Sequence, residues 1–470
     1  MDQDDGSSSA TSWPLQLFSK MSLPPSLGGS PYPWLRELKS EERGLYLIHL
    51  LLACANYVSS GSLSNANVAL DQISQLSSMN GDTMQRIAAY FAEALADRII
   101  KSWPGLHRAL NSTRVSILSD EMLVKKLFFE MFPFLKAGFV LANQAIIEAM
   151  EGEKMVHVID LCGSEPSQWI PLLQALSARS GGPPHLRITG IHPEKPVLDG
   201  MAKRLAEEAE KLDIPFQFNP VVSTLDSLDF DTLRVKTGEA LAISSFLQFH
   251  TLLASDDEST RKRSLFGSNG IHLQKLLQMN RSSSGGLLEK DPANGYSGSP
   301  DSTSSPPLTA SCHSKIESFL SNLRGLSPKL VVVVMEQDSN HNGLPLMERL
   351  TEALYSYAAM FDCLESTVPR TSVERLKLEK MMFGEEIKNI IACEGAERKE
   401  RHERLEKWAW RLDTGGFKNV PLSYLSLLQA RMLLQVYNCD SYRIKEENGC
   451  AVIYWQDRSL FSVSAWTSRK

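Results

Sequence analysis

The sequence predicts an α/β protein in which a mainly parallel sheet carries an N-terminal helical cap. Three observations predict this class: helically spaced apolar residues over 38–118, alternating strand-like and helix-like stretches over 155–335, and strand-like runs near the C-terminus. Alternating strands and helices are typical of a parallel sheet with helices on both faces. A chain of 470 residues is also long enough to form more than one subdomain.

Composition excludes several classes of protein. Lys+Arg 49 against Asp+Glu 55 gives a net charge of −6, so overall positive charge does not hold nucleic acid. The chain has no run of about 18 apolar residues, which excludes a membrane span, and its acidic start is unlike a secretory signal. Its seven scattered cysteines include no C-x-x-C pair, which argues against disulfides and a structural zinc site.

The N-terminal part divides into a tail and a helical cap. Residues 1–37 are rich in Ser, Pro and Gly and are expected to be disordered. Residues 38–118 form the leucine-rich cap, where Leu45, Ile48 and Leu52 fall at helical spacing. We expect these three at core or interface positions. An outward apolar face would bind a second chain, and packing onto the rest of this chain is the alternative.

Residues 119–470 are expected to form the α/β core. Apolar runs predict strands at 155–160, 186–191, 216–219, 240–243 and 330–335, and a helix follows over 346–364. A Ser/Gly/Pro-rich stretch at 282–314 predicts a flexible insertion.

The C-terminal part predicts a charged helix and an antiparallel ending. Residues 397–411 alternate acidic and basic side chains, which favours i,i+4 ion pairs on a solvated helix. Asn448-Gly449 between two β-rich runs is a strong hairpin signal, and 460–466 is the last strand. Five parallel strands with this ending match the layout of Rossmann-like, class I methyltransferase-like folds.

The same segments, in the same order, resemble the GRAS family of plant nuclear regulators. The family's V-H-I-I-D stretch is matched at 156–160, a second leucine-rich block lies at 197–250, and the S-A-W region covers 398–470. E-Q-E-x-N-H-N, N-I-V-A-C-E-G and E-R-x-E-R-H-E elements are matched at 336–342, 389–395 and 397–403. The motif residues that we single out are Val156, His157, Val158, Ile159, Asp160, Arg398, Glu400, Arg401, His402, Glu403, Trp455, Ser464, Ala465 and Trp466.

The resemblance, which spans 38–470, implies a nuclear regulator of transcription in plant development. It implies partners among other GRAS proteins of the scarecrow, short-root and DELLA types, as homo- or heterodimers, and among indeterminate-domain zinc-finger proteins. It also implies roles in gibberellin signalling and root development.

Methyl transfer is the enzymatic alternative. A cofactor site of that kind needs glycines after the first strand and an acid at the end of the second. Here the loop Asp160–Ser167 has a single glycine, and the second strand ends Ile191-His192-Pro193-Glu194. We therefore expect no catalytic, cofactor or metal site. His157 is interpreted as a satisfied core or interface histidine, and Asp160 as a helix cap or an acceptor from backbone amides.

Direct DNA binding is the other alternative. The basic candidates are 261–263 and 398–411, and the second alternates with glutamates. No zinc-finger, homeodomain or basic-zipper signature is present. The preferred interpretation is recruitment to DNA through a DNA-binding partner.

Overall fold

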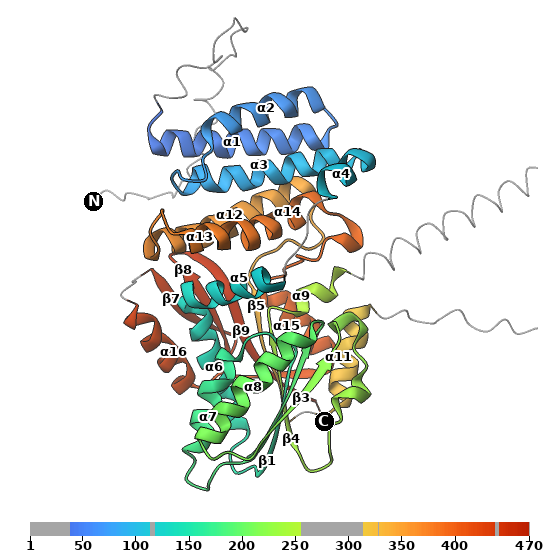
Figure 1. The fold of residues 1–470 in the computed structure, drawn as a ribbon, viewed down its shortest axis with the longest axis vertical. Helices are drawn as coiled ribbons and strands as arrows, with labels where there is room; N and C mark the ends of the chain where they lie inside the picture. Colours follow the sequence, from blue (N-terminus) through green and yellow to red (C-terminus); the bar gives the residue numbers. More distant parts are fainter. Residues whose placement is uncertain (1–37, 113–117, 255–313, 328, 438–440, 470) are drawn as a thin grey trace, which may run out of the picture.

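The computed structural model describes residues 38–112, 118–254, 314–327, 329–437 and 441–469. The expectations for the tail 1–37 and for 282–313 of the insertion fall outside these ranges. In the described part, a helical layer lies across one end of an α/β layer that is built on one mixed sheet (Figure 1). This confirms the predicted α/β class with its N-terminal helices.

Five parallel strands form one half of the sheet, in the order β3-β2-β1-β4-β5. They are β1 (Met155–Asp160), β2 (His185–His192), β3 (Phe216–Val222), β4 (Ala240–Phe246) and β5 (Leu330–Gln337). The strand order reverses between β1 and β4, and ligands of doubly wound folds bind at that point, outside the carboxyl ends of the strands.

Antiparallel strands form the other half. β9 (Arg458–Ser468) pairs with β5, with β8 (Cys450–Trp455) and with the short β6 (Phe417–Val420), and β8 pairs with β7 (Tyr442–Glu447). Asn448 and Gly449 both have positive φ, 53° and 77°, as a type I′ turn requires. The predicted hairpin is confirmed.

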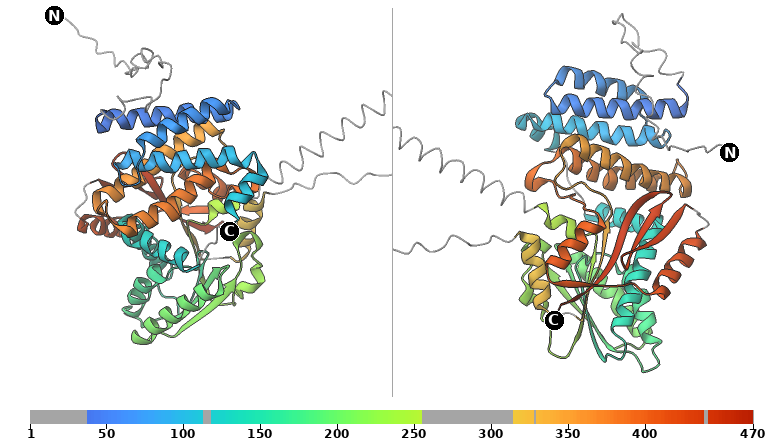
Figure 2. Two further views of the ribbon diagram at one scale, coloured as in Figure 1. Left: turned by 45° about the horizontal axis from the view of Figure 1, so that its top comes forward. Right: turned by 180° about the vertical axis from the view of Figure 1, so that it is seen from behind.

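Helices cover both faces of the sheet (Figure 2). One face carries α6 (Pro133–Ala149), α7 (Trp169–Ser177), α8 (Lys195–Lys211) and α16 (Tyr424–Val436), and the other carries α9 (Phe249–Leu252), α11 (Lys315–Gly325) and α15 (Leu405–Thr414). Each face has its own apolar cluster, because side chains alternate across a strand: Val158 belongs to one cluster and Ile159 to the other. None of the described helices is long and apolar enough to cross a membrane.

The helical cap is assembled from two distant parts of the chain. Its first part is α1 (Ser40–Ser59), α2 (Leu63–Leu76), α3 (Thr83–Lys101) and α4 (Pro104–Asn111). α12 (Leu346–Thr367), α13 (Val373–Leu378) and α14 (Gly384–Ala392) form the layer beneath, where α12 and α14 pack against α3 (Figure 1). α5 (Leu118–Met131) leads from the cap into the α/β layer. The N-terminal helices therefore bury their inner faces against helices of the same chain.

Most of the stripe singled out on α1 lies away from the core, although Leu52 packs against it. Leu45 is 63% exposed and Ile48 and Leu52 are half-buried, whereas the buried face is formed by Leu47, Leu50, Leu51 and Cys54. Both stripes have helical spacing, because α1 is apolar around most of its circumference. Leu45, Ile48 and Leu52 remain predicted interface positions.

The predicted charged helix over 397–411 is wrong in its first half. α15 begins only at Leu405, and residues 398–404 have no regular secondary structure. The side chains of Arg398, Arg401, His402 and Glu403 are buried rather than solvated. The i,i+4 charge pattern suggests a helix, but Arg398, Arg401 and Glu403 also bond to the 336–342 segment, which is distant in sequence.

Candidate functional site

His157 of the V-H-I-I-D-like stretch is a satisfied interior residue, as its position in β1 suggests. Its Nε2 lies 2.8 Å from Thr189 Oγ1, and its Nδ1 lies 3.0 Å from the Arg187 guanidinium. Burial and the Arg187 charge lower the pKa of His157 to about 4. The ring is thus neutral and fully enclosed, which does not suit it to act as a base on a substrate.

Asp160 organises the loop after β1. Its carboxylate accepts hydrogen bonds from the backbone N–H of Cys162 at 2.9 Å and from Trp169 Nε1 at 2.7 Å. Burial raises the pKa of this carboxyl, although both hydrogen bonds oppose the shift. Asp160 therefore ties the end of β1 to the start of α7, in agreement with its interpretation as an acceptor from backbone amides.

The loop after β1 lacks the several glycines with which a nucleotide cofactor such as S-adenosylmethionine is usually bound. Gly163, its single glycine, has φ +49°, and a Cβ added there would overlap the Ile191 carbonyl oxygen. The side of Gly163 on which a Cβ would stand is therefore filled by the end of β2. β2 itself ends in His192, whose Nδ1 accepts from the Glu194 backbone N–H, so the residue at the strand end is an imidazole and not the carboxylate that usually holds a ribose.

Three of the predicted motif segments meet at the carboxyl edge of the sheet. The His402 carbonyl oxygen accepts from the backbone N–H groups of His341 and Asn342, and Asn342 donates its side-chain amide to Glu403. Arg398 donates to the His341 carbonyl oxygen at 2.7 Å. Asn389 Oδ1 accepts from the backbone N–H groups of Lys399 and Glu400. The resemblance identified these segments, and in the fold their side chains and backbone groups hold the three segments together by hydrogen bonds.

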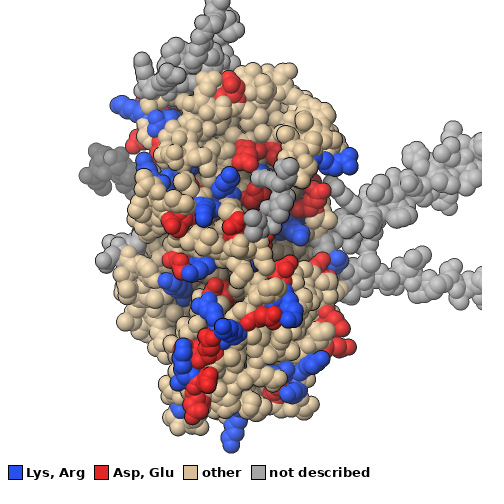
Figure 3. Space-filling model, in the orientation of Figure 1, with Lys and Arg blue, Asp and Glu red and all other residues tan. Residues whose placement is uncertain are grey.

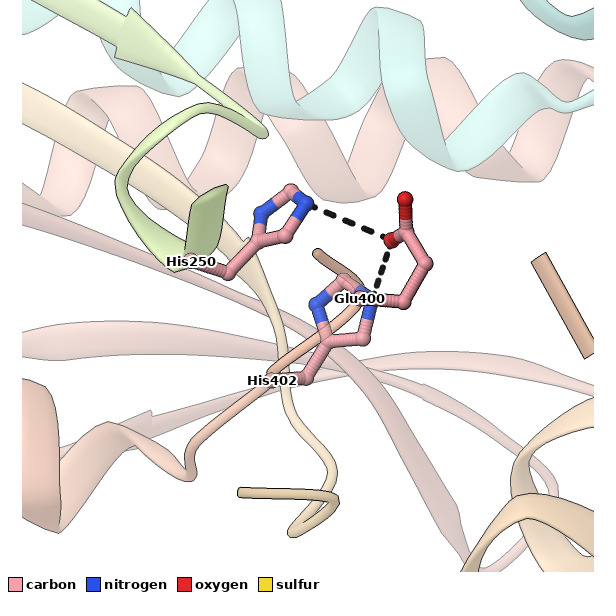
Figure 4. A group of neighbouring side chains, drawn as sticks. All are labelled: His250, Glu400 and His402. Carbon is pink, nitrogen blue, oxygen red and sulfur yellow. Dashed lines mark ion pairs between the residues drawn. The ribbon is translucent and has the colours of Figure 1, made fainter. Parts of the chain in front are cut away.

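A cluster of histidines and glutamates lies where these segments meet (Figure 4). The Glu400 carboxylate lies 3.4 Å from His250 Nε2 and 3.2 Å from His402 Nε2. The two imidazole rings are 4.3 Å apart between centroids. Both histidines are buried, and Glu400 is largely so.

Glu336 at the end of β5 fixes the His250 ring. Its carboxylate accepts from His250 Nδ1 at 2.8 Å and from the Phe249 backbone N–H at 2.7 Å. Burial alone would lower the pKa of His250, but the Glu336 and Glu400 carboxylates raise it to about 10. Burial and the neighbouring His250 lower the pKa of His402. Near neutral pH the His250 ring is therefore protonated and charged, and the His402 ring is neutral.

The cluster borders a cavity of about 230 Å³. Phe128, Phe129, Phe246, Met360, Phe383 and Phe461 contribute to its apolar lining, and Gln248, Tyr357 and Glu386 add polar groups. A second cavity of about 360 Å³ lies over the ends of β1, β2 and β3. The two cavities are neighbours, because they share the lining residues Lys125, Cys162, Gln248 and Thr251. Burial and the Glu400 charge raise the pKa of Glu386 to about 8.

Sequence reasoning named Glu400 and His402 but missed His250. That residue falls in the second leucine-rich block, and no local pattern marks it as functional.

The C-terminal motif residues lie in the antiparallel half of the sheet. They are Trp455, Ser464, Ala465 and Trp466, and Trp455 Nε1 donates to Asp362 at 2.7 Å. They do not contribute to the histidine–glutamate cluster.

Comparisons with known proteins agree with these motifs. The model of the GRAS domain family matches residues 47–467. Scarecrow-like protein 3 of Arabidopsis thaliana is 64% identical over 479 aligned positions, covering 100% of this chain and 99% of that protein. GRAS family protein TF80 of Medicago truncatula is 51% identical and covers 94% of this chain and 99% of its own.

A solved structure shows the same fold. The crystal structure of SCL7 from Oryza sativa superposes with a TM-score of 0.68 at 26% identity, covering 89% of this chain and 99% of that one. With a family model that spans most of the sequence and relatives aligned over nearly their whole length, the conclusion is direct: this chain belongs to the GRAS family of plant transcriptional regulators.

Proposed function

We propose that the chain acts in the nucleus as a non-enzymatic scaffold that joins DNA-binding proteins to other regulators. The observation that carries this proposal is the exposed apolar stripe of α16, which consists of Tyr424, Leu428, Met432 and Val436. These residues recur every fourth position, and Tyr424 and Val436 are 74% and 77% exposed. A contiguous apolar helix face of this kind is typical of a protein-binding surface.

The cap supports a second contact, with a related chain. α4 has no buried residue, and Trp103, Leu106 and Leu110 are exposed on or beside it. Leu45 on α1 adds to the exposed apolar surface of the cap. We assign this surface to homo- or heterodimers with GRAS proteins of the scarecrow, short-root or DELLA types.

Recruitment to DNA is assigned to indeterminate-domain zinc-finger partners. Arg398 and Arg401 place their guanidinium groups on carbonyl oxygens of their own chain, so they do not reach a phosphate backbone. On the face shown in Figure 3, basic and acidic side chains are interleaved rather than gathered into a basic surface. This arrangement favours indirect over direct DNA contact. The relatedness to Scarecrow-like protein 3 supports roles in gibberellin signalling and root development.

Replacing Val436 by Glu is expected to weaken binding of the zinc-finger partner by about tenfold or more, since a charge would enter an apolar contact. Stability should not change, because the side chain is exposed. The measurement is a titration of the partner, bound to its promoter fragment, with each variant. Val373→Glu is the matched control, because Val373 is a similarly exposed valine at the start of α13. Equal affinities of the two variants would remove α16 from the proposal.

S-adenosylmethionine is expected to give no saturable heat in a calorimetric titration with the full chain at up to roughly 0.1 mM ligand. The physical reason is that the loop after β1 has a single glycine, Gly163, which packs against the end of β2 at Ile191. An isotherm with one site per chain would support the methyltransferase alternative over the scaffold.

A further inference from the structure

We propose that His250, Glu400 and His402 form a binding site for one divalent transition-metal ion, best suited to Zn²⁺. The proposal rests on the geometry of the cluster and is independent of the scaffold function. Because more than 140 residues separate His250 from the other two ligands, no sequence spacing suggests this site.

The two distances from the Glu400 oxygen to the histidine nitrogens match a tetrahedral site. A Zn²⁺ ion lies about 2.0–2.1 Å from imidazole nitrogen and carboxylate oxygen, so two ligand atoms of a tetrahedron are about 3.3 Å apart. The Glu400 oxygen lies 3.4 Å from His250 Nε2 and 3.2 Å from His402 Nε2, and all three atoms lie within 4.8 Å of one another. Both Nε2 atoms are directed at the same carboxylate oxygen, as Figure 4 shows.

The surroundings of His250 and Glu400 are those of a supported metal site. A histidine that ligates through Nε2 usually donates Nδ1–H to a carboxylate, which fixes the tautomer and the ring orientation. Glu336 occupies that place at 2.8 Å from His250 Nδ1, and its other oxygen is held by the Phe249 backbone N–H. Asn389 holds the backbone of Glu400 in position. These contacts preorganise the ligands without help from an ion.

The ring nitrogens of His402 are poorly satisfied in the interior, where Nε2 has the Glu400 carboxylate at 3.2 Å as an ion-pair partner. The residue is 3% exposed, yet neither ring nitrogen makes a well-aligned hydrogen bond to any described residue. A buried polar group without such a bond is costly, and coordination of Nε2 would satisfy it. Two histidines and one glutamate leave a fourth position of the ion for water or a ligand, and all three residues line the 230 Å³ cavity.

The site can be tested on the full chain, freed of any histidine tag and treated with a chelator. Titration with Co²⁺ is expected to produce visible d–d absorption that saturates at one equivalent and is bleached by Zn²⁺. Bound metal should also raise the melting temperature. A wild-type chain that shows no such absorption in excess Co²⁺ overturns the proposal, and this result does not depend on any variant.

Variants then assign the ligands. Loss of an outer-shell partner typically weakens metal binding by about 10–100-fold, and this is the loss of Co²⁺ affinity expected for Glu336→Gln. Glu400→Gln and His402→Gln remove ligands themselves, so each should weaken Co²⁺ binding by at least as much. His192→Gln is the matched control, because His192 is a buried histidine that lines only the neighbouring cavity. Unchanged binding by His402→Gln, or an equal loss in His192→Gln, would contradict the assignment.

Discussion

Replacing Trp466 by Ala is expected to lower the free energy of unfolding by about 3–5 kcal/mol, the cost of truncating a buried tryptophan. Trp466 is 3% exposed and packs in the apolar cluster that also holds Trp408 and Phe417. On β9 it is the register partner of Val331 in β5 and of Asn419 in β6. The cavity would therefore open where three strands are joined, and partner binding should be lost with the fold.

Trp410→Ala is the matched control for this measurement. Trp410 lies on α15 and is 59% exposed, so its truncation should change stability by no more than about 0.5 kcal/mol. Urea unfolding of the two variants and the parent chain gives the comparison. A soluble Trp466→Ala chain that unfolds at the same urea concentration as the parent would show that the antiparallel half does not depend on this side chain.

The parts of the fold that follow local rules are the parts that sequence reasoning predicts well. β1 occupies the residues of its apolar run, and the Asn448-Gly449 hairpin forms where two residues tolerant of positive φ stand together. Both signals are contained in a few consecutive residues. Helix α12 is similarly evident from its spacing over 346–364, although the structure extends it to Thr367.

The failures involve residues whose partners are distant in sequence. Residues 398–404 have a helical charge pattern, but Arg401 donates to Gly395 and Asn342, and Glu403 accepts from Asn342 and Arg411. Only the parallel sheet, which gathers the ends of β4 and β5, brings His250 and Glu336 to this segment. On α1, period alone could not choose between two apolar stripes, because the choice depends on where α3 and α12 lie.

A buried ion-pair network between the two parts of the helical cap leads to the other large effect. Arg86 on α3 and Arg375 on α13 both approach Glu379, at 3.2 and 2.8 Å, and both also contact Glu365 of α12. Arg86, Arg375 and Glu379 are each no more than 2% exposed. The network therefore connects the N-terminal helices to the later helices through charges that are shielded from solvent.

Glu379→Ala is expected to destabilise the protein by about 3–5 kcal/mol, since it leaves two buried guanidinium groups to share one remaining carboxylate. Glu385→Ala removes an exposed glutamate from α14 and should cost no more than about 1 kcal/mol, as for a surface ion pair. Because the loss falls on contacts of α3 and α13, hydrogen exchange should accelerate first in α1–α3 and leave β1 and β4 protected. Uniform acceleration across the chain would instead mean that the cap and the sheet unfold as one unit. In that case the network would not stabilise the part of the cap that carries Leu45 independently of the site at His402.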